Sequence, residues 1–310
     1  MTSRPPHPEP ARTSAPAPAR AVLGDRGAPR HAVVLAPVMP RWDQGAFFRH
    51  VAEPLLADGH RITVYDTLSL LREGDDLKAL VDRWGQYLAP GGPAADEAGG
   101  GDAAPSVLAG NALGGAVVQA LLDREWTHRS RVVLLSGPTV ADDELNTTLE
   151  RIAAAVTGRG LAAALGLLDE VVRGPGPRPA AEQNTEQNTA QNTAQNTAQN
   201  TAQNTAQDTA QNTGPVQPPS LDEQLAGVRL AAGLRLLHDA DAREPVRGFP
   251  GPLLHVYGEQ SLLVRRHHLA TGPRPDHHLV GIPGAGMRPH ADQAALTRGT
   301  IARFLGAEES

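Results

Sequence analysis

The chain has 310 residues, contains no cysteine and has few aromatic residues, which make up 3% of it. The lack of cysteine excludes disulfide bonds, thiolate nucleophiles and Cys-ligated metal sites, and it favours a cytoplasmic location. No apolar stretch approaches the ~18 residues that would suggest a membrane span, and residues 1–29 lack the apolar segment of a signal peptide. We therefore expect a cytoplasmic protein that does not enter a membrane.

The charge pattern excludes further partners. The net charge is −6 and there is no long basic run, so nothing in the chain predicts binding to nucleic acid. No histidines with neighbouring carboxylates have the H-x-x-x-H or H-x-H spacing of metal sites, and we expect neither a metal nor a cofactor. Arginine is far more frequent than lysine, and Ala, Gly and Pro are abundant, which is typical of actinobacterial coding bias.

Runs of apolar residues and chain breakers predict an α/β domain with additions. Residues 1–29, rich in Pro, Ala and Arg, are expected to be a disordered tail. Strands are predicted at 31–36, 61–65, 107–109 and 132–135 and after 252 and 279, and helical spacing predicts helices at 46–56 and 77–88. The core is therefore expected to comprise 30–140 and 248–310. Residues 141–247, with helical periodicity at 145–172 and 221–238, form a separate helical insertion.

A repeat of period four, Gln-Asn-Thr followed by Ala or Glu, runs from 183 to 213 inside this insertion. It is either a polar, self-associating tether or a slippage expansion in a loop that tolerates length, since loop-closure cost grows slowly with loop length. With no apolar residue larger than Ala to bury, the repeat is expected to be disordered.

The segment Gly110–Gly115, Gly-Asn-Ala-Leu-Gly-Gly, follows an apolar strand and opens an apolar helix. It is similar to the nucleophile elbow G-x-S-x-G, in which a strained residue is exposed above the sheet. From about His31 to Leu305 the chain resembles the α/β-hydrolase superfamily. The resemblance implies a mostly parallel central sheet with helices on both faces and an α-helical lid over 141–247. In this elbow Ala112 stands where the superfamily has its nucleophile.

Two further positions depart from the superfamily pattern. Ser261 ends Gly-Glu-Gln-Ser, where the resemblance implies a triad aspartate, and Met287 ends Gly-Ala-Gly-Met, where it implies the catalytic histidine. A Ser–His–Asp triad needs a nucleophile, a base and an orienting acid, and Ala112, Ser261 and Met287 supply none of these roles. Loss of the nucleophile or the histidine costs roughly a million-fold in kcat, so ordinary hydrolysis at this site is not expected.

The predicted pocket is mostly apolar. The superfamily usually has His-Gly after the first core strand, whereas this chain has Ala-Pro at 36–37, which makes Val38 the backbone N–H donor of the oxyanion site. The expected pocket residues are Val38, Met39, Trp42, Ala112, Leu113, Met287 and His290. Trp42 is interpreted as a packing residue or a stacking wall, and His290 as a surface residue, a base or a ligand contact. Asp43 and Asp142 are expected to cap helices.

Three functions fit this reading. The first is a non-hydrolytic biosynthetic enzyme of the epimerase or isomerase type, acting on a small molecule or a modified peptide whose own group moves the proton. The replaced triad is similar to that of the bottromycin-pathway epimerases, α/β-hydrolase-fold proteins of peptide natural-product biosynthesis. The second is a ligand-binding or carrier protein without turnover. The third is a serine hydrolase with a relocated triad, using Ser136 and His290.

Overall fold

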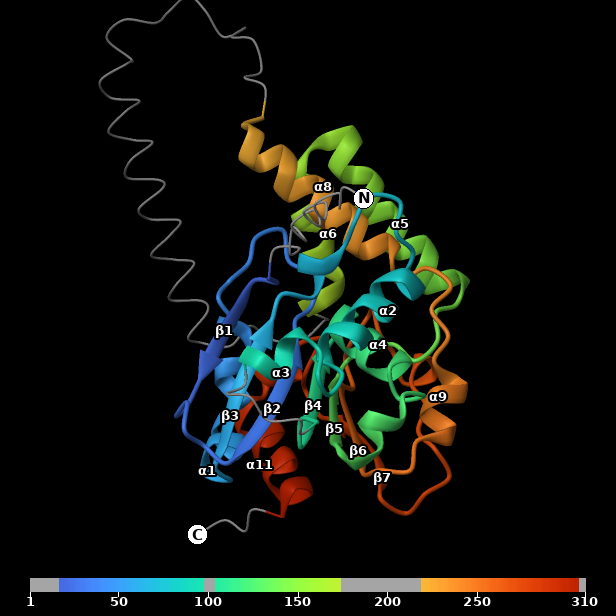
Figure 1. Ribbon diagram of the computed structural model, residues 1–310. Coiled ribbons are helices and arrows are strands. Elements are labelled where there is room, and N and C mark those ends of the chain that lie inside the picture. Colours follow the sequence, from blue (N-terminus) through green and yellow to red (C-terminus); the bar gives the residue numbers. More distant parts are fainter. Residues whose placement is uncertain (1–16, 98–103, 174–218, 307–310) are drawn as a thin grey trace, which may run out of the picture.

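The computed structural model describes residues 17–97, 104–173 and 219–306. Its centre is a seven-stranded sheet with the order β1-β3-β2-β4-β5-β6-β7 (Figure 1). The strands are β1 (Arg20–Leu23), β2 (Arg30–Leu35), β3 (His60–Tyr65), β4 (Val107–Asn111), β5 (Arg131–Leu135), β6 (Leu253–Gly258) and β7 (His277–Ile282). All neighbouring pairs are parallel except β1 with β3. The predicted α/β-hydrolase architecture is confirmed.

The prediction of a disordered tail over 1–29 is wrong at its C-terminal end. Residues Arg20–Leu23 form β1, which pairs antiparallel with β3 so that Arg20 lies opposite Tyr65 and Leu23 opposite Ile62. Three consecutive apolar residues are too short a run to stand out in a Pro/Ala/Arg-rich stretch. The strand forms because β3 offers an unpaired edge to which the preceding chain can hydrogen-bond.

Helices cover both faces of the sheet. One face carries α2 (Leu77–Leu88), α3 (Pro93–Glu97), α4 (Leu113–Ala120) and α9 (Arg243–Gly248), and the other carries α1 (Glu53–Ala57), α10 (Pro289–Asp292) and α11 (Ala294–Leu305). Short 3-10 helices are η1 (Ala46–Val51), η2 (Thr67–Leu70), η3 (Glu125–Arg129) and η4 (Arg266–His268). Along β2, Val33 and Leu35 face one core while Ala32 and Val34 face the other, as the two-residue period of a strand requires.

The helix expected at 46–56 is divided. It begins as η1 and restarts as α1, which has Pro54 in its first turn. Proline cannot donate a backbone hydrogen bond inside a helix but fits at its start, so Pro54 ends the first helix and begins the next. The helix expected at 77–88 is α2, which is capped by the side chain of Asp76.

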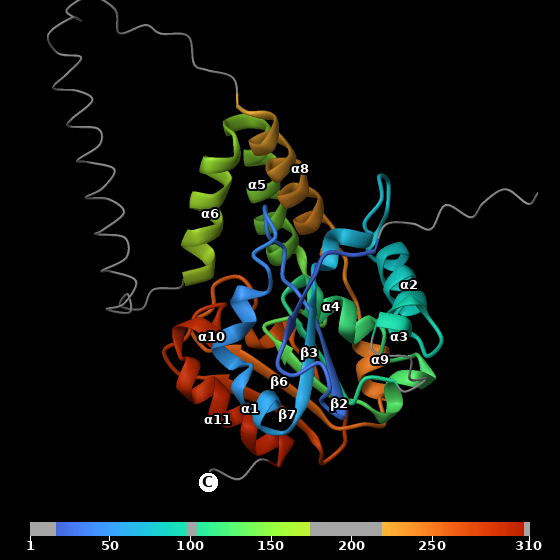
Figure 2. The same cartoon turned by 60° about the vertical axis from the view of Figure 1, so that its left-hand side comes forward.

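A lid of three helices lies over one end of the sheet (Figure 2). It consists of α5 (Asp143–Arg159), α6 (Leu161–Arg173) and α8 (Leu221–Arg235), which pack on one another. Gly160, with φ 84°, breaks the long helical pattern into α5 and α6. The expected lid range of 141–247 is too long, because α9 packs against α4 in the core layer. The Gln-Asn-Thr repeat lies outside the described residues. Among the residues that the structure describes, no helix is long and apolar enough to cross a membrane.

Candidate functional site

The turn between β4 and α4 has the backbone of a nucleophile elbow. Ala112 connects the strand to the helix with φ 48° and ψ −113°, a conformation that L-residues rarely adopt. Its backbone N–H donates to the carbonyl of Leu135 on the neighbouring strand, at 3.0 Å. The elbow is thus present in its strained form, and its apex carries a methyl group in place of a nucleophile.

Two glycines allow the elbow to pack this tightly. A Cβ at Gly114 would lie 2.1 Å from the carbonyl oxygen of Leu35, and a Cβ at Gly110 would lie 2.4 Å from that of Gly114. Both distances are far shorter than any contact that real side chains make, so these positions accept only glycine. The glycines hold α4 against β2 and fix the conformation of Ala112 between them.

Ser261 and Met287, the other two residues that the resemblance aligns with the triad, have ordinary structural environments. Ser261 is buried in the turn after β6, where its hydroxyl accepts the backbone N–H of Val264 at 3.2 Å. Met287 is buried after β7, and its backbone N–H donates to the carbonyl of Val172 at the end of α6, at 2.8 Å. Ser261 therefore stabilises a turn, and Met287 connects the end of the lid helix α6 to the core.

A cavity of about 640 Å³ lies between the elbow and the lid. Its floor comes from the loops after β2, β4 and β7, and its roof from α5, α6 and α8. The lining residues are Pro37, Val38, Met39, Asp43, Phe47, Asn111, Ala112, Leu149, Leu165, Gly166, Leu168, Asp169, Val172, Leu234, Leu237, Leu263, Met287, Arg288 and His290. Clefts at the carboxyl ends of parallel strands are the usual ligand sites of such sheets.

The structure brings together five of the seven pocket residues that the sequence predicts: Val38, Met39, Ala112, Met287 and His290 all line the cavity. Leu113 and Trp42 do not. The side chain of Leu113 is fully buried in the core on the α4 side of the sheet, and Trp42 packs on the core of the opposite face. This contact favours the packing interpretation of Trp42. The sequence missed the lid residues, because its periodicity does not show which helical face covers the cavity.

His290 is the buried histidine of the cavity floor. Its ring nitrogens lie 3.4 and 3.5 Å from the amide nitrogen of Asn111, and Phe47 makes an edge contact with the ring. Burial, together with the nearby charges of Arg288 and His50, lowers the pKa of His290 to about 3. The imidazole is therefore neutral at physiological pH and is a weak base.

Of the two aspartates predicted to cap helices, Asp142 is the N-cap of α5, whereas the N-cap of η1 is Gly45 and Asp43 lies two residues before it. Asp43 accepts the backbone N–H groups of Gly45 and Phe47 at 2.8 and 3.0 Å, at the start of η1. Asp142 accepts the N–H of Leu145 at 2.9 Å and caps α5. Both carboxylates are thus committed to helix starts.

Asp142 also meets two histidines that the sequence did not connect with it. Nε2 of His268 lies 3.1 Å and Nε2 of His267 lies 3.2 Å from its carboxylate, a grouping compatible in reach with a metal ion. However, Nδ1 of His268 accepts the backbone N–H of Arg265, which places the proton of the neutral ring on Nε2. That nitrogen faces Asp142 as N–H rather than as a lone pair. The arrangement therefore fits an aspartate–histidine contact better than a metal site.

The relocated triad has no geometric support. Ser136, at the end of β5, is fully buried and does not line the cavity that contains His290. Its φ of 48° is positive, yet its hydroxyl has no hydrogen-bond partner among the described residues. The neighbouring strand carries His255, which is fully buried and whose pKa burial lowers to about 4. Both side chains belong to the interior of the sheet.

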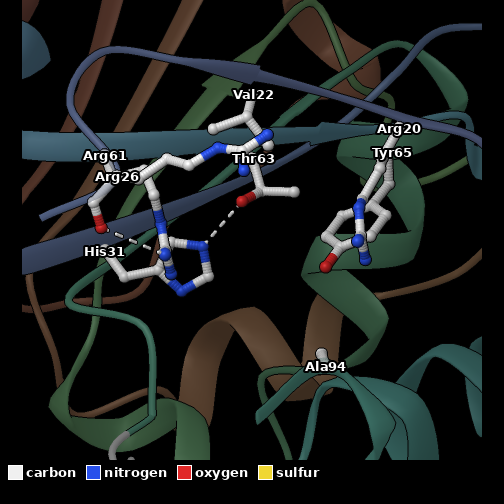
Figure 3. Close-up of a pocket in the computed structure, with 8 residues that line it drawn as sticks. All are labelled: Arg20, Val22, Arg26, His31, Arg61, Thr63, Tyr65 and Ala94. Carbon is white, nitrogen blue, oxygen red and sulfur yellow. Dashed lines mark hydrogen bonds between the residues drawn. The ribbon is translucent and has the colours of Figure 1, made fainter. Parts of the chain in front are cut away.

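A second, smaller cavity of about 160 Å³ lies at the β1 edge of the sheet (Figure 3). Three arginines from β1, β3 and the loop after β1 surround it: Arg20, Arg26 and Arg61. His31 hydrogen-bonds to Thr63 there at 2.9 Å, and burial lowers the pKa of His31 to about 4. This cavity lacks the elbow, the lid and the apolar wall of the larger one, which is the better candidate site.

No protein-family model and no curated protein sequence matches the chain. Solved structures match nearly all of it. MGS-M2, an α/β hydrolase from a Medee basin deep-sea metagenome library, has a TM-score of 0.64 at 14% identity, covering 94% of this chain and 95% of its own. The thermophilic esterase of Thermogutta terrifontis has a TM-score of 0.59 at 17% identity, covering 93% and 92%. The bromoperoxidase of Bacillus anthracis has a TM-score of 0.56 at 18% identity, covering 93% and 94%. The chain thus has the α/β-hydrolase fold.

Proposed function

We propose that this protein binds an apolar, carbonyl-bearing ligand in the lid-covered cavity and acts on it without hydrolysis. The reaction is of the epimerase or isomerase type, in which a proton next to the carbonyl group is removed and returned. The ligand is a small molecule or a modified peptide from a biosynthetic pathway. No part of the proposal requires a covalent intermediate with the protein.

The strained conformation of Ala112 is the observation that carries the proposal. A non-glycine residue with positive φ costs about 1 to 3 kcal/mol, and it persists only where the surroundings enforce it. Alanine has no functional group to expose, so the strain does not serve a nucleophile. What the elbow still positions is backbone: α4 begins at Leu113, and the first N–H groups of a helix have no acceptor within it.

These N–H groups supply an oxyanion site. The two proposed donors to a ligand carbonyl oxygen are the N–H of Val38, which lines the cavity, and the N–H of Leu113, which directly follows the cavity residue Ala112 although the side chain of Leu113 lies in the core. Donors fixed in this way stabilise the negative charge that develops on the oxygen when the adjacent proton leaves. The elbow therefore provides the backbone N–H donors that an enolate-forming reaction needs, without a nucleophile.

The proton acceptor comes from the ligand. Met287 cannot accept a proton, and the lowered pKa of His290, about 3, makes its imidazole too weak a base for the purpose. Among the described cavity residues, Asp43 is bonded to two backbone N–H groups and Asp169 is paired with Arg173. A basic group carried by the ligand and held near its own carbonyl would supply the missing function by proximity.

The test is to incubate the purified chain in D2O with a panel of apolar ketones, esters and thiazoline-bearing peptides. Binding is followed by native mass spectrometry, and each ligand is recovered for analysis of mass and stereochemistry. A bound ligand that returns with deuterium next to its carbonyl group, or with inverted configuration, supports the proposal. Recovery of hydrolysed ligand would contradict it.

The low basicity of His290 also favours a second candidate, a carrier that binds the ligand without turnover. The same experiment separates the two functions. A ligand that binds in the cavity and returns unchanged, with no deuterium after many binding cycles, identifies a carrier.

A further inference from the structure

Arg288 is the unsatisfied cation of the large cavity. It lies between Met287 and His290 in the cavity wall, immediately before α10. Its Nε is buried without a hydrogen-bond partner, and within the described parts of the chain the guanidinium has no carboxylate in salt-bridge range. Because Arg288 lines the cavity and has no carboxylate partner among the described residues, its guanidinium is available to an anionic group of a ligand.

The other charges of the cavity do not neutralise Arg288. Both carboxylate oxygens of Asp43 accept backbone N–H groups. Asp169 is engaged by Arg173, one turn further along α6, at 2.5 Å. By contrast, Arg229, which joins the lid to the core, donates from two guanidinium nitrogens to Asp66 and to the carbonyl of Met39. Among the described residues, Arg288 therefore stands out as a positive charge that lines the cavity and has no carboxylate partner.

We propose that the ligand of this cavity is an apolar carboxylate and that Arg288 binds its carboxylate group. The inference rests on the proposed function and names the class of ligand that the same site takes. A planar guanidinium pairs with a carboxylate through two parallel hydrogen bonds, which fixes orientation as well as charge. One arginine balances one carboxylate. A phosphate dianion would need further donors, and the carboxylates of Asp43 and Asp169 in the same wall disfavour it.

The position of Arg288 connects this contact with the elbow. Arg288, His290 and Ala112 line one cavity, and the charge of Arg288 is close enough to His290 to depress its pKa. A carboxylate held by Arg288 thus anchors one end of the ligand beside the floor. The apolar remainder lies under the lid residues of α5, α6 and α8.

The experiment compares two ligands of the same shape, 4-phenylbutyrate and 4-phenylbutyramide, by isothermal titration calorimetry on the full chain. We expect the wild-type chain to bind the carboxylate roughly 10- to 100-fold more tightly than the amide, the effect of a charge-assisted hydrogen bond. Arg288→Gln is expected to abolish this preference, so that the carboxylate and the amide bind this variant with similar affinity. Arg298→Gln, on α11 and outside the cavity, is the matched control and keeps the preference.

Each outcome decides something different. Equal affinity for the two ligands in the wild-type chain, or a preference that survives Arg288→Gln, overturns the carboxylate assignment and leaves the proposed function standing. Binding of neither ligand likewise overturns the carboxylate assignment, while the proposed function is decided separately by the exchange experiment in D2O. Should Arg288→Gln fail to fold, Arg288→Lys retains the charge without the planar fork, and it is expected to keep a reduced preference for the carboxylate. An Arg288→Lys chain with an undiminished preference would show that charge alone, rather than paired hydrogen bonds, selects the ligand.

Discussion

Ala112 has a backbone conformation that its side chain disfavours, and this strain can be measured. Replacing Ala112 by Gly removes the clash of Cβ at φ 48° but increases the entropy of the unfolded chain. We expect the free energy of unfolding to rise by about 1 kcal/mol, as measured by urea denaturation. The control is Ala154→Gly on the exposed face of α5, which is expected to lose about 1 kcal/mol. Equal losses at the two sites would show that the elbow is unstrained.

Introducing a serine at the elbow alone is not expected to produce hydrolysis. Ala112→Ser places a hydroxyl at the elbow, but Met287 and Ser261 supply neither the base nor the acid that would activate it. We expect the variant to hydrolyse p-nitrophenyl butyrate at the rate of the wild-type chain. The triple variant Ala112→Ser, Ser261→Asp, Met287→His is the informative comparison, since it introduces all three residue types. Robust turnover by the single variant would mean that a base exists that we have not assigned.

Buried neutral histidines predict a stability that depends on pH. The pKa values of His290 and His255 are lowered from 6.5 to about 3 and about 4. At pH values between the lowered pKa and 6.5, each histidine binds a proton in the unfolded chain but not in the folded chain. The contribution of the two histidines to the free energy of unfolding is therefore fully present above pH 6.5 and is lost as the pH falls below it. Each group contributes a slope of about 1.4 kcal/mol per pH unit. Denaturation at pH 5 and pH 7.5 measures how the free energy of unfolding changes with pH. His290→Gln is expected to reduce this change, whereas the control His278→Gln, at an exposed position, is expected to leave it as it is. An unaltered slope in His290→Gln would contradict the burial argument.

At the scale of elements, the sequence predicts what depends on local pattern and misses what depends on neighbours. The helix Leu77–Leu88 follows from its apolar spacing and from Asp76 as its cap, and the strand runs of the core follow from their apolar continuity. By contrast, β1 exists because β3 offers it an edge, which no residue of β1 reveals. The site divides in the same way. Ala112 and Met287 are visible through their motifs, whereas Arg288, Leu165 and Leu234 become cavity residues only through the packing of the lid.

The lid is held to the core by a contact that can be tested. Arg229 on α8 pairs with Asp66 and also donates to the carbonyl of Met39, which lines the cavity. Asp66 is 3% exposed, so Arg229→Met would leave its carboxylate buried without the guanidinium. We expect a loss of about 1 to 3 kcal/mol in the free energy of unfolding and faster release of any cavity ligand.

The control for this prediction lies on the same helix. Arg41 pairs with Asp222 near the start of α8, but the two side chains are 60% and 74% exposed. Exposed pairs contribute about 0 to 1 kcal/mol, so Arg41→Met is expected to have a small effect. If the two variants lose equal stability, the contact of Arg229 does not act as a clamp on the lid.

At the scale of the whole molecule, the core and the lid form different sides of the cavity. The sheet, the glycine-packed elbow and the two cores form the floor of the cavity, while the lid helices, which belong to one long insertion, contribute a second set of apolar residues as its roof. Such a division allows the insertion to change length without disturbing the elbow. The Gln-Asn-Thr repeat at 183–213 falls between α6 and α8 in the sequence. It contains no apolar residue larger than Ala that would have to be buried.

Deleting residues 183–213 tests this separation. Helix α6 ends at the core, where the backbone N–H of Met287 donates to the carbonyl of Val172, whereas α8 begins at the opposite end of the lid (Figure 2). A helix of 13 residues is about 20 Å long, and the linker left after the deletion, residues 174–182 and 214–218, can span up to about 45 Å. The shorter loop costs less entropy to close, so the free energy of unfolding is expected to stay level or rise by up to about 1 kcal/mol. A fall of more than about 1 kcal/mol in denaturant titrations would instead show that the repeat packs against the body, contrary to its composition.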